Sequence, residues 1–170
     1  SGLINVTDSL AIYLEANSAS YGNVSLTVTS PVNLDATGGT YTINPTASQT
    51  VSYTSCSTKN NTAANGGISL SYTQVSSSSG FSLSGNKATY TNNNTTSSRS
   101  YQVNVIATGE CSKTNTKTIT FTQSAGQKIY SNPVISIFEY ANKAGVTGGK
   151  IKPTIYVTQK YKYNNTGTEY

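Results

Sequence analysis

Apolar and polar residues alternate in short stretches along most of this 170-residue chain. From Tyr101 to Val105, for example, every second residue is apolar and the residues between are Gln and Asn. This alternation places the apolar side chains on one face of a β-strand, whereas no window has the spacing of a three-turn helix. The pattern predicts strands near residues 10–16, 23–29, 40–44, 49–55, 67–74, 80–84, 87–91, 100–108, 116–123, 133–138, 149–158 and 160–163.

Clusters of Gly, Asn and Ser separate these stretches, as at Gly38-Gly39 and Gly85-Asn86. Short strands spaced about 8–12 residues apart with such turns are typical of a sandwich or barrel. The composition agrees, because the chain contains 25 Ser, 27 Thr and 18 Asn but no Met, and only 10% of its residues are charged. We therefore predict an all-β fold.

An internal repeat organises the chain. Residues 21–28, the Gly pair at 38–39 and Gln49 recur as residues 130–137, the Gly pair at 148–149 and Gln159. Tyr130 lies 109 positions after Tyr21, and small changes of this offset fit loops of different length. We expect one complete sandwich at 21–129 and the opening strands of a second at 130–170.

The first twenty residues match the end of the complete repeat, since Leu10 and Ile12 align with Ile119 and Phe121. Residues 1–20 are thus expected to form a terminal strand and linker that close a preceding or partner repeat. An open half-sandwich exposes strand edges and an apolar face. Leu10, Ile12 and Leu14 are therefore candidates for strand donation into residues 130–170 of another molecule. The alternative is a segment of a longer array, whose neighbouring repeats supply the missing strands.

Two cysteines, Cys56 and Cys111, stand in similar settings where a strand pattern gives way to polar turn residues. Without His or a CxxC motif, they do not form one of the usual zinc or iron–sulfur frameworks. A structural disulfide is the favoured interpretation, and two free thiols are the alternative.

Residues that carry catalytic chemistry are scarce. The absence of His excludes Ser-His-Asp and Cys-His sites, and the six carboxylates are isolated in sequence. We expect no enzyme activity, no metal and no cofactor. The net charge of +5 is spread over alternate residues, which does not favour nucleic acid, and no apolar run is long enough to span a membrane. Tyr156, Tyr161 and Tyr163 are the candidates for ligand or interface contact.

Several strand motifs resemble a known class of repeat. They are Gly38 to Ile43, Phe81 to Tyr90, Arg99, Tyr101, Val103, Val105 and Thr118 to Gly126. Together they are similar to bacterial immunoglobulin-like surface repeats, especially the BACON-like modules of Bacteroidetes and their phages. The resemblance implies an immunoglobulin-like antiparallel β-sandwich at a cell or virion surface.

These observations lead to one expected function and one alternative. The first is a non-catalytic, extracellular structural or adhesive module of a repetitive surface protein, fibre or virion appendage. Its partners would be other copies of itself or adjacent repeats. The alternative is a carbohydrate-binding module in which exposed tyrosines contact a polysaccharide.

Overall fold

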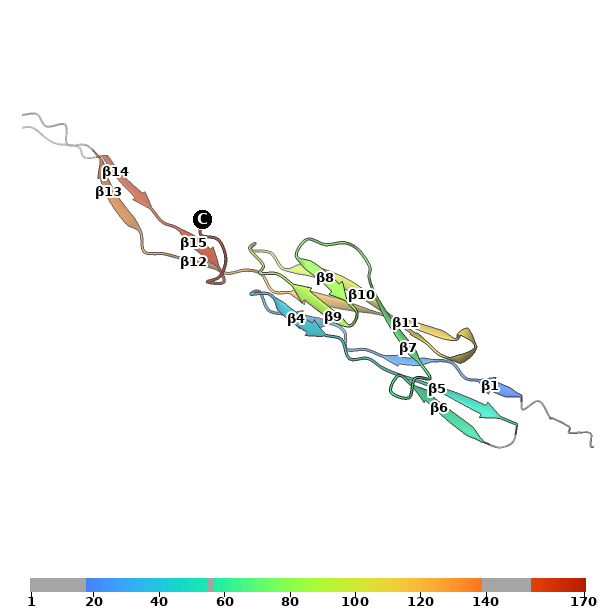
Figure 1. Ribbon diagram of the computed structural model, residues 1–170. Helices are drawn as coiled ribbons and strands as arrows, with labels where there is room; N and C mark the ends of the chain where they lie inside the picture. The colour runs from blue at the N-terminus through green and yellow to red at the C-terminus, as the bar shows by residue number, and fades with distance from the viewer. Residues whose placement is uncertain (1–17, 55–56, 139–153) are drawn as a thin grey trace, which may run out of the picture.

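The computed structural model describes residues 18–54, 57–138 and 154–170 and has an elongated, all-β architecture (Figure 1). The predicted all-β fold class is confirmed, and the described residues contain one short 3₁₀ turn at Glu110–Ser112. The strands are β1 (Ala19–Tyr21), β2 (Ser25–Thr27), β3 (Val32–Leu34), β4 (Gly39–Thr42), β5 (Thr46–Tyr53), β6 (Thr58–Thr62), β7 (Ser69–Gln74), β8 (Phe81–Ser84), β9 (Lys87–Tyr90), β10 (Arg99–Thr108), β11 (Thr114–Gln123), β12 (Lys128–Tyr130), β13 (Val134–Phe138), β14 (Thr154–Thr158) and β15 (Tyr161–Tyr163).

Strands β1 to β11 form a sandwich-like body from three sheets. In the first sheet β5 pairs with β1, β2 and β6. The second has the order β3-β11-β10-β7, and the third has the order β4-β9-β8. These pairings are antiparallel except that of β3 with β11, which is parallel.

One apolar core joins the three sheets. Along β10, the residues Tyr101, Val103, Val105 and Ala107 are buried, as the alternating sequence predicts. Phe81 on β8 stacks on Tyr101 with ring centroids 4.5 Å apart. The remaining buried apolar residues of the core are Val24, Leu26, Val32, Leu34, Ile43, Ile68, Ala88, Tyr90, Ile119 and Phe121.

Four short or polar strands were not predicted, namely β1, β3, β6 and β12. Strand β6, with the sequence Thr-Lys-Asn-Asn-Thr, has no apolar residue, so its sequence carries no alternation. It forms because β5 offers a long edge for pairing, and its buried side chain is Asn61. The other three strands contain three residues each, which is too short for a period of two to be recognised.

Strands β12 to β15 form two narrow antiparallel pairs beyond the body, β12 with β15 and β13 with β14. We call these four strands and the segment up to Tyr170 the C-terminal ribbon. In Figure 1, β1 lies at one end of the elongated molecule and the β13–β14 pair at the other. The predicted division of the chain at residue 130 stays a prediction, and β12 crosses that position.

Candidate functional site

The C-terminal ribbon repeats the strand pairing of β1, β2 and β5 in the body. In the body Tyr21 pairs with Val51, and in the ribbon Tyr130 pairs with Tyr161. Likewise, the pair of Ser25 with Ser48 corresponds to that of Val134 with Thr158. The first member of each pair is shifted by 109 positions and the second by 110. The ribbon therefore has the register of the body's own opening strands.

Main-chain hydrogen bonds follow the same correspondence. Gly22 N donates to Thr50 O at 2.9 Å, and Ser131 N donates to Lys160 O at 2.8 Å. Thr54 N donates to Ser18 O at 3.2 Å, and the corresponding bond is donated by Asn164 N to Gln127 O at 2.8 Å. The hydrogen bonds on either side of β1 thus recur on either side of β12.

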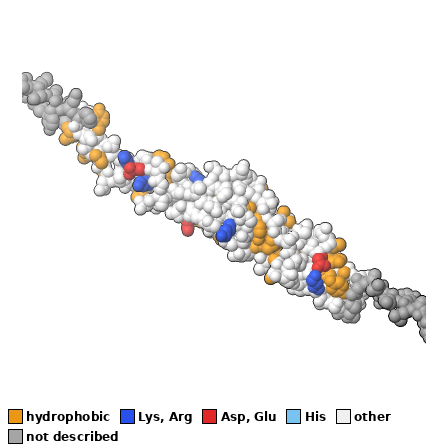
Figure 2. Space-filling view, viewed as in Figure 1, with side chains coloured by type: hydrophobic (Ala, Val, Ile, Leu, Met, Phe, Trp, Pro, Cys, Tyr) orange, Lys and Arg blue, Asp and Glu red, His pale blue; other side chains and the backbone are white. Residues whose placement is uncertain are grey.

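One face of the β13–β14 pair is apolar and exposed. Ile135 pairs with Val157 and Ile137 with Ile155, so the four side chains lie on the same face. Each is more than half exposed, from 55% for Ile155 to 64% for Ile135. Figure 2 shows hydrophobic side chains at this end of the molecule, and further groups of them along the body.

The corresponding face of the body is covered. Leu26, the counterpart of Ile135, is only 5% exposed and belongs to the core with Ile119 and Phe121 of β11. Asn115, also on β11, donates a side-chain hydrogen bond to Val24 O at 2.8 Å. Strand β11 therefore lies over the β2 face, and the described residues place no corresponding strand over the ribbon.

Gln49 shows how the body binds the segment just before β11. This side chain is 1% exposed, and its Nε2 donates to Gly22 O at 3.0 Å and to Glu110 O at 3.1 Å. Its Oε1 accepts a hydrogen bond from Glu110 N at 2.8 Å. Gln49 thus pairs with both main-chain polar groups of Glu110.

Gln159 occupies the position of Gln49 in the ribbon. Its Nε2 donates to Ser131 O at 2.9 Å, which corresponds to the bond between Gln49 and Gly22. Gln159 is exposed, and no described residue takes the place of Glu110 beside it. Only the recurrence of Gln49 as Gln159 in the repeat could have indicated this residue from the sequence.

Asn164 joins the ribbon to the body. Its Nδ2 lies within hydrogen-bonding distance of Ala36 O at 3.2 Å, Asn92 Oδ1 at 2.8 Å and Asn93 O at 3.1 Å. Its Oδ1 accepts a bond from Gln127 N at 2.8 Å. Asn164 has a φ of 52°, a left-handed conformation that Asn tolerates better than most residues.

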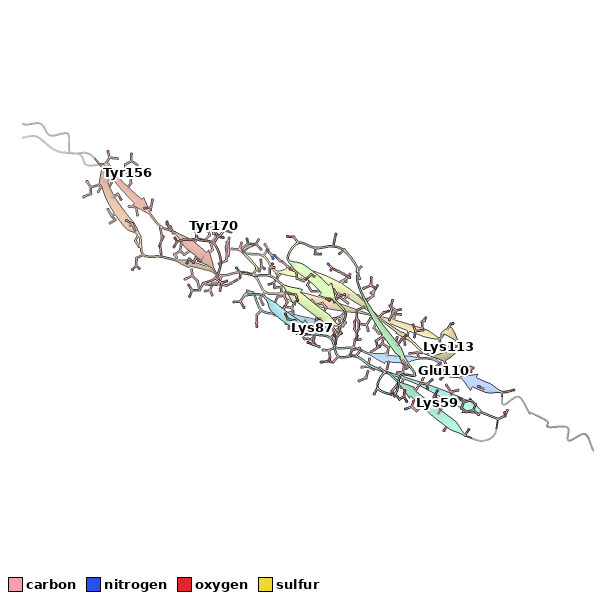
Figure 3. The ribbon with its side chains drawn as sticks, in the orientation of Figure 1. Lys59, Lys87, Glu110, Lys113, Tyr156 and Tyr170 are labelled. Atoms are coloured by element: carbon pink, nitrogen blue, oxygen red, sulfur yellow. The ribbon has the colours of Figure 1, made fainter. Side chains whose placement is uncertain are left out.

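The predicted contact tyrosines fall into two environments. Tyr156 lies on β14, on the face opposite the four aliphatic side chains, and is 57% exposed. Tyr161 and Tyr163 are half-buried near the junction, where Tyr161 stacks on Tyr170 at a centroid distance of 5.4 Å. Lys128 Nζ lies 4.3 Å from the Tyr161 ring centroid, a cation–π contact. Figure 3 shows Tyr156 and Tyr170 at separate places along the ribbon.

A small hollow of about 170 Å³ lies where the ribbon meets the body. It is lined by Thr91, Asn92, Asn94, Tyr163, Thr166, Gly167, Thr168 and Tyr170. Amide and hydroxyl groups beside an aromatic ring can hydrogen-bond and stack on a sugar. The three tyrosines thus lie on two surfaces, the junction and the outer face of β14, and their role in ligand or interface contact stays a prediction.

A charged pair lies at the β1 end of the body, far from the ribbon in Figure 3. Lys59 Nζ donates to Glu110 Oε1 at 2.6 Å, and Asn61 Nδ2 donates to the same oxygen at 3.0 Å. The bond from Lys59, followed by that from Asn61, lowers the pKa of the Glu110 carboxyl below its ordinary value. The hydrogen bond to Glu110 also raises the pKa of Lys59.

The other predicted site residues are less informative. Cys111 is a free and exposed cysteine, so the structure gives the predicted disulfide no support, and its partner Cys56 lies outside the described residues. Intact mass without reductant tests this bridge. Leu10, Ile12 and Leu14 also lie outside the described residues.

Metal and membrane sites receive no support from the described part of the chain. No cluster of three or more His, Cys, Asp or Glu side chains occurs among the described residues. They also contain no helix of the length and apolar character that crossing a membrane requires. Comparison of the chain with protein-family models, with curated proteins and with solved structures finds no significant match.

Proposed function

We propose that this protein is a non-catalytic structural or adhesive module of an extracellular repetitive protein, fibre or virion appendage, built on an immunoglobulin-like sandwich. In this proposal copies associate end to end. The N-terminal segment of one copy packs as a strand on the apolar face of the C-terminal ribbon of the next, as β11 packs on β2 in the body. The observation that carries the proposal is the exposed apolar face of the ribbon, whose counterpart in the body packs against the core that includes β11.

The donor strand follows from the repeat. Leu10 and Ile12 occupy the sequence positions of Ile119 and Phe121, the buried residues of β11. Leu14 corresponds to Gln123, which is also fully buried. Burial of three such leucine and isoleucine side chains offers roughly 5–9 kcal/mol before the costs of ordering and association.

The elongated shape supports a donor and an acceptor that belong to different molecules. Residue 18, where the described chain starts, lies beside β1 at one end, and the β13–β14 pair lies at the other (Figure 1). Such an interface is heterologous, so it adds copies in one direction unless its rotation closes a ring.

Deletion of residues 1–17 tests the proposal. We expect the intact chain to show an average mass that rises with concentration in light scattering. The deleted chain should stay monomeric because it retains the ribbon and lacks the donor. Equal monomeric mass of both chains at all concentrations would refute strand donation.

A substitution variant distinguishes the effect of the donor's apolar side chains from the effect of deleting the whole segment. Substitution of Leu10, Ile12 and Leu14 by Ser should abolish association. The matched control is Tyr13→Ser, because Tyr13 alternates with Ile12 and Leu14 and lies on the opposite face of the donated strand. Similar losses in both variants would contradict the proposed strand orientation.

Carbohydrate binding is the second candidate, supported by the hollow at the junction and its Asn, Thr and Tyr side chains. Tyr163 lies edge-on to Tyr161 and Tyr170, so part of each ring already contacts another ring. A glycan array with Tyr170→Ala as the comparison tests this candidate. Binding to no glycan would remove it.

A further inference from the structure

The apolar pattern alone does not fix the register of the donated strand, that is, its position along the ribbon. The apolar stripe of the donor repeats every two residues, as do the aliphatic pairs on the ribbon. A slip of the donor by two residues would therefore keep every apolar side chain on the correct face. A group that occurs once, and does not repeat every two residues, must therefore distinguish the correct register.

Within the body, a glutamine provides such a group. Gln49 accepts from Glu110 N at 2.8 Å and donates to Glu110 O at 3.1 Å, so it binds one peptide position in both directions. Glu110 lies in the turn between β10 and β11, so this contact holds the start of β11 against β5. The contact is buried, where a lost hydrogen bond is costly.

We propose that Gln159 binds the main-chain N–H and C=O of a second copy, just before its donated strand, and thereby sets the register of association. This inference rests on the proposed function. Gln159 retains the bond to Ser131 O that corresponds to the bond between Gln49 and Gly22. Its exposed amide has the acceptor and second donor N–H that Gln49 uses to bind Glu110.

The sequence repeat also identifies the residue of the second copy that should contact Gln159. The shift of 109 positions that aligns Leu10 with Ile119 aligns Ser1 with Glu110. The main chain at Ser1 and Gly2 of the second copy is therefore the expected partner of Gln159. Recognition of main chain, and not of a side chain, explains why Ser can replace Glu at this position.

Gln159→Ala in the full chain tests the inference by sedimentation velocity. We expect the association constant to fall about tenfold, the effect of losing two hydrogen bonds. The thermal stability of the body should not change, because Gln159 lies outside it. The matched control is Gln102→Ala, an exposed glutamine on β10.

Gln49→Ala provides the reciprocal control. It removes the same bonds inside one body, so it should lower the unfolding temperature and leave the association constant unchanged. Deletion of residues 1–3 should weaken association to the same extent as Gln159→Ala. The two changes together should have no further effect, because they remove the two partners of one contact.

The outcomes separate the two proposals. If the intact chain associates, the chain without residues 1–17 does not, and Gln159→Ala associates normally, the inference about Gln159 is wrong and strand donation stands. Additive effects of Gln159→Ala and the three-residue deletion also contradict it. An intact chain that stays monomeric overturns both proposals. Association that survives deletion of residues 1–17 and is lost in Ile135→Asn assigns another segment to the ribbon, which also overturns both.

Discussion

At the scale of single residues, buried amide side chains fill part of the interior of this chain, which is rich in Ser, Thr and Asn. Gln123 Nε2 donates to Thr91 O at 2.8 Å, and its Oε1 accepts from Tyr101 Oη at 3.0 Å. Asn93 Nδ2 donates to Ser97 O at 2.8 Å and Ser124 O at 2.9 Å. Such groups tie loops to strands and are stabilising only while their partners are present.

Glu110 yields a pH-dependent prediction at this scale. Its pKa is lowered in the folded protein, chiefly by the hydrogen bond from Lys59. Its contribution to stability is therefore full above the ordinary carboxyl pKa and is lost as the pH falls through the lowered value. We expect Glu110→Gln to lower the unfolding temperature at pH 7, with a difference from wild type that shrinks as the pH falls below about 4.

Lys59→Met provides the control for this pH dependence. In that background only the hydrogen bond from Asn61 still lowers the pKa of Glu110. The effect of Glu110→Gln should then be smaller at pH 7 and vary less with pH. An effect of Glu110→Gln that is constant from pH 7 to pH 3 would contradict the assigned cause.

At the scale of elements, the ribbon is held by its turn and not by a shared core. Strand β15 ends at Tyr163, and Asn164 and Asn165 follow with φ values of 52° and 57°. Asn164 bonds to the body through Ala36, Asn92 and Asn93, whereas Asn165 is exposed. Asn164 thus makes three of the printed contacts at the junction, and Asn94 adds a longer one to Tyr170 Oη at 3.4 Å.

We expect Asn164→Ala to release the ribbon from the body, with a loss of about 1–3 kcal/mol in the free energy of local opening. Hydrogen exchange of the Gly126 amide, which lies just before the ribbon and donates to Thr95 O in the body, measures this opening. Asn165→Ala is the matched control, because it bears the same left-handed conformational cost without the junction bonds. Equal acceleration of exchange in both variants would attribute the effect to the turn alone.

At the scale of the whole molecule, elongation decides the form of any assembly. The β1 end and the exposed ribbon lie at opposite ends (Figure 1), so each added copy should lengthen the particle without thickening it. We expect small-angle X-ray scattering to give the same cross-sectional radius of gyration for the associated intact chain and for the monomer without residues 1–17. A larger cross-section on association would indicate side-by-side packing.

Much of the fold could be predicted from the sequence because its long strands alternate strictly. Strand β10 was expected at 100–108 and found at Arg99–Thr108, and β11 was expected at 116–123 and found at Thr114–Gln123. The polar strand β6 could not be predicted, because its pairing with β5 and not its own composition makes it a strand. Gln159 was not predicted as a site residue, although the recurrence of Gln49 as Gln159 in the repeat marks its position.

By itself, the sequence determined the all-β class, the long strands and the recurrence of one pattern, since alternation and repetition are local properties of the chain. Only the tertiary structure decided that Leu26 is buried while Ile135 is exposed. It also decided that Gln49 binds Glu110 while Gln159 has no such neighbour among the described residues. Equivalent residues differ in these ways because burial depends on which distant strand lies over them, and β11 covers the first copy of the pattern but not the second.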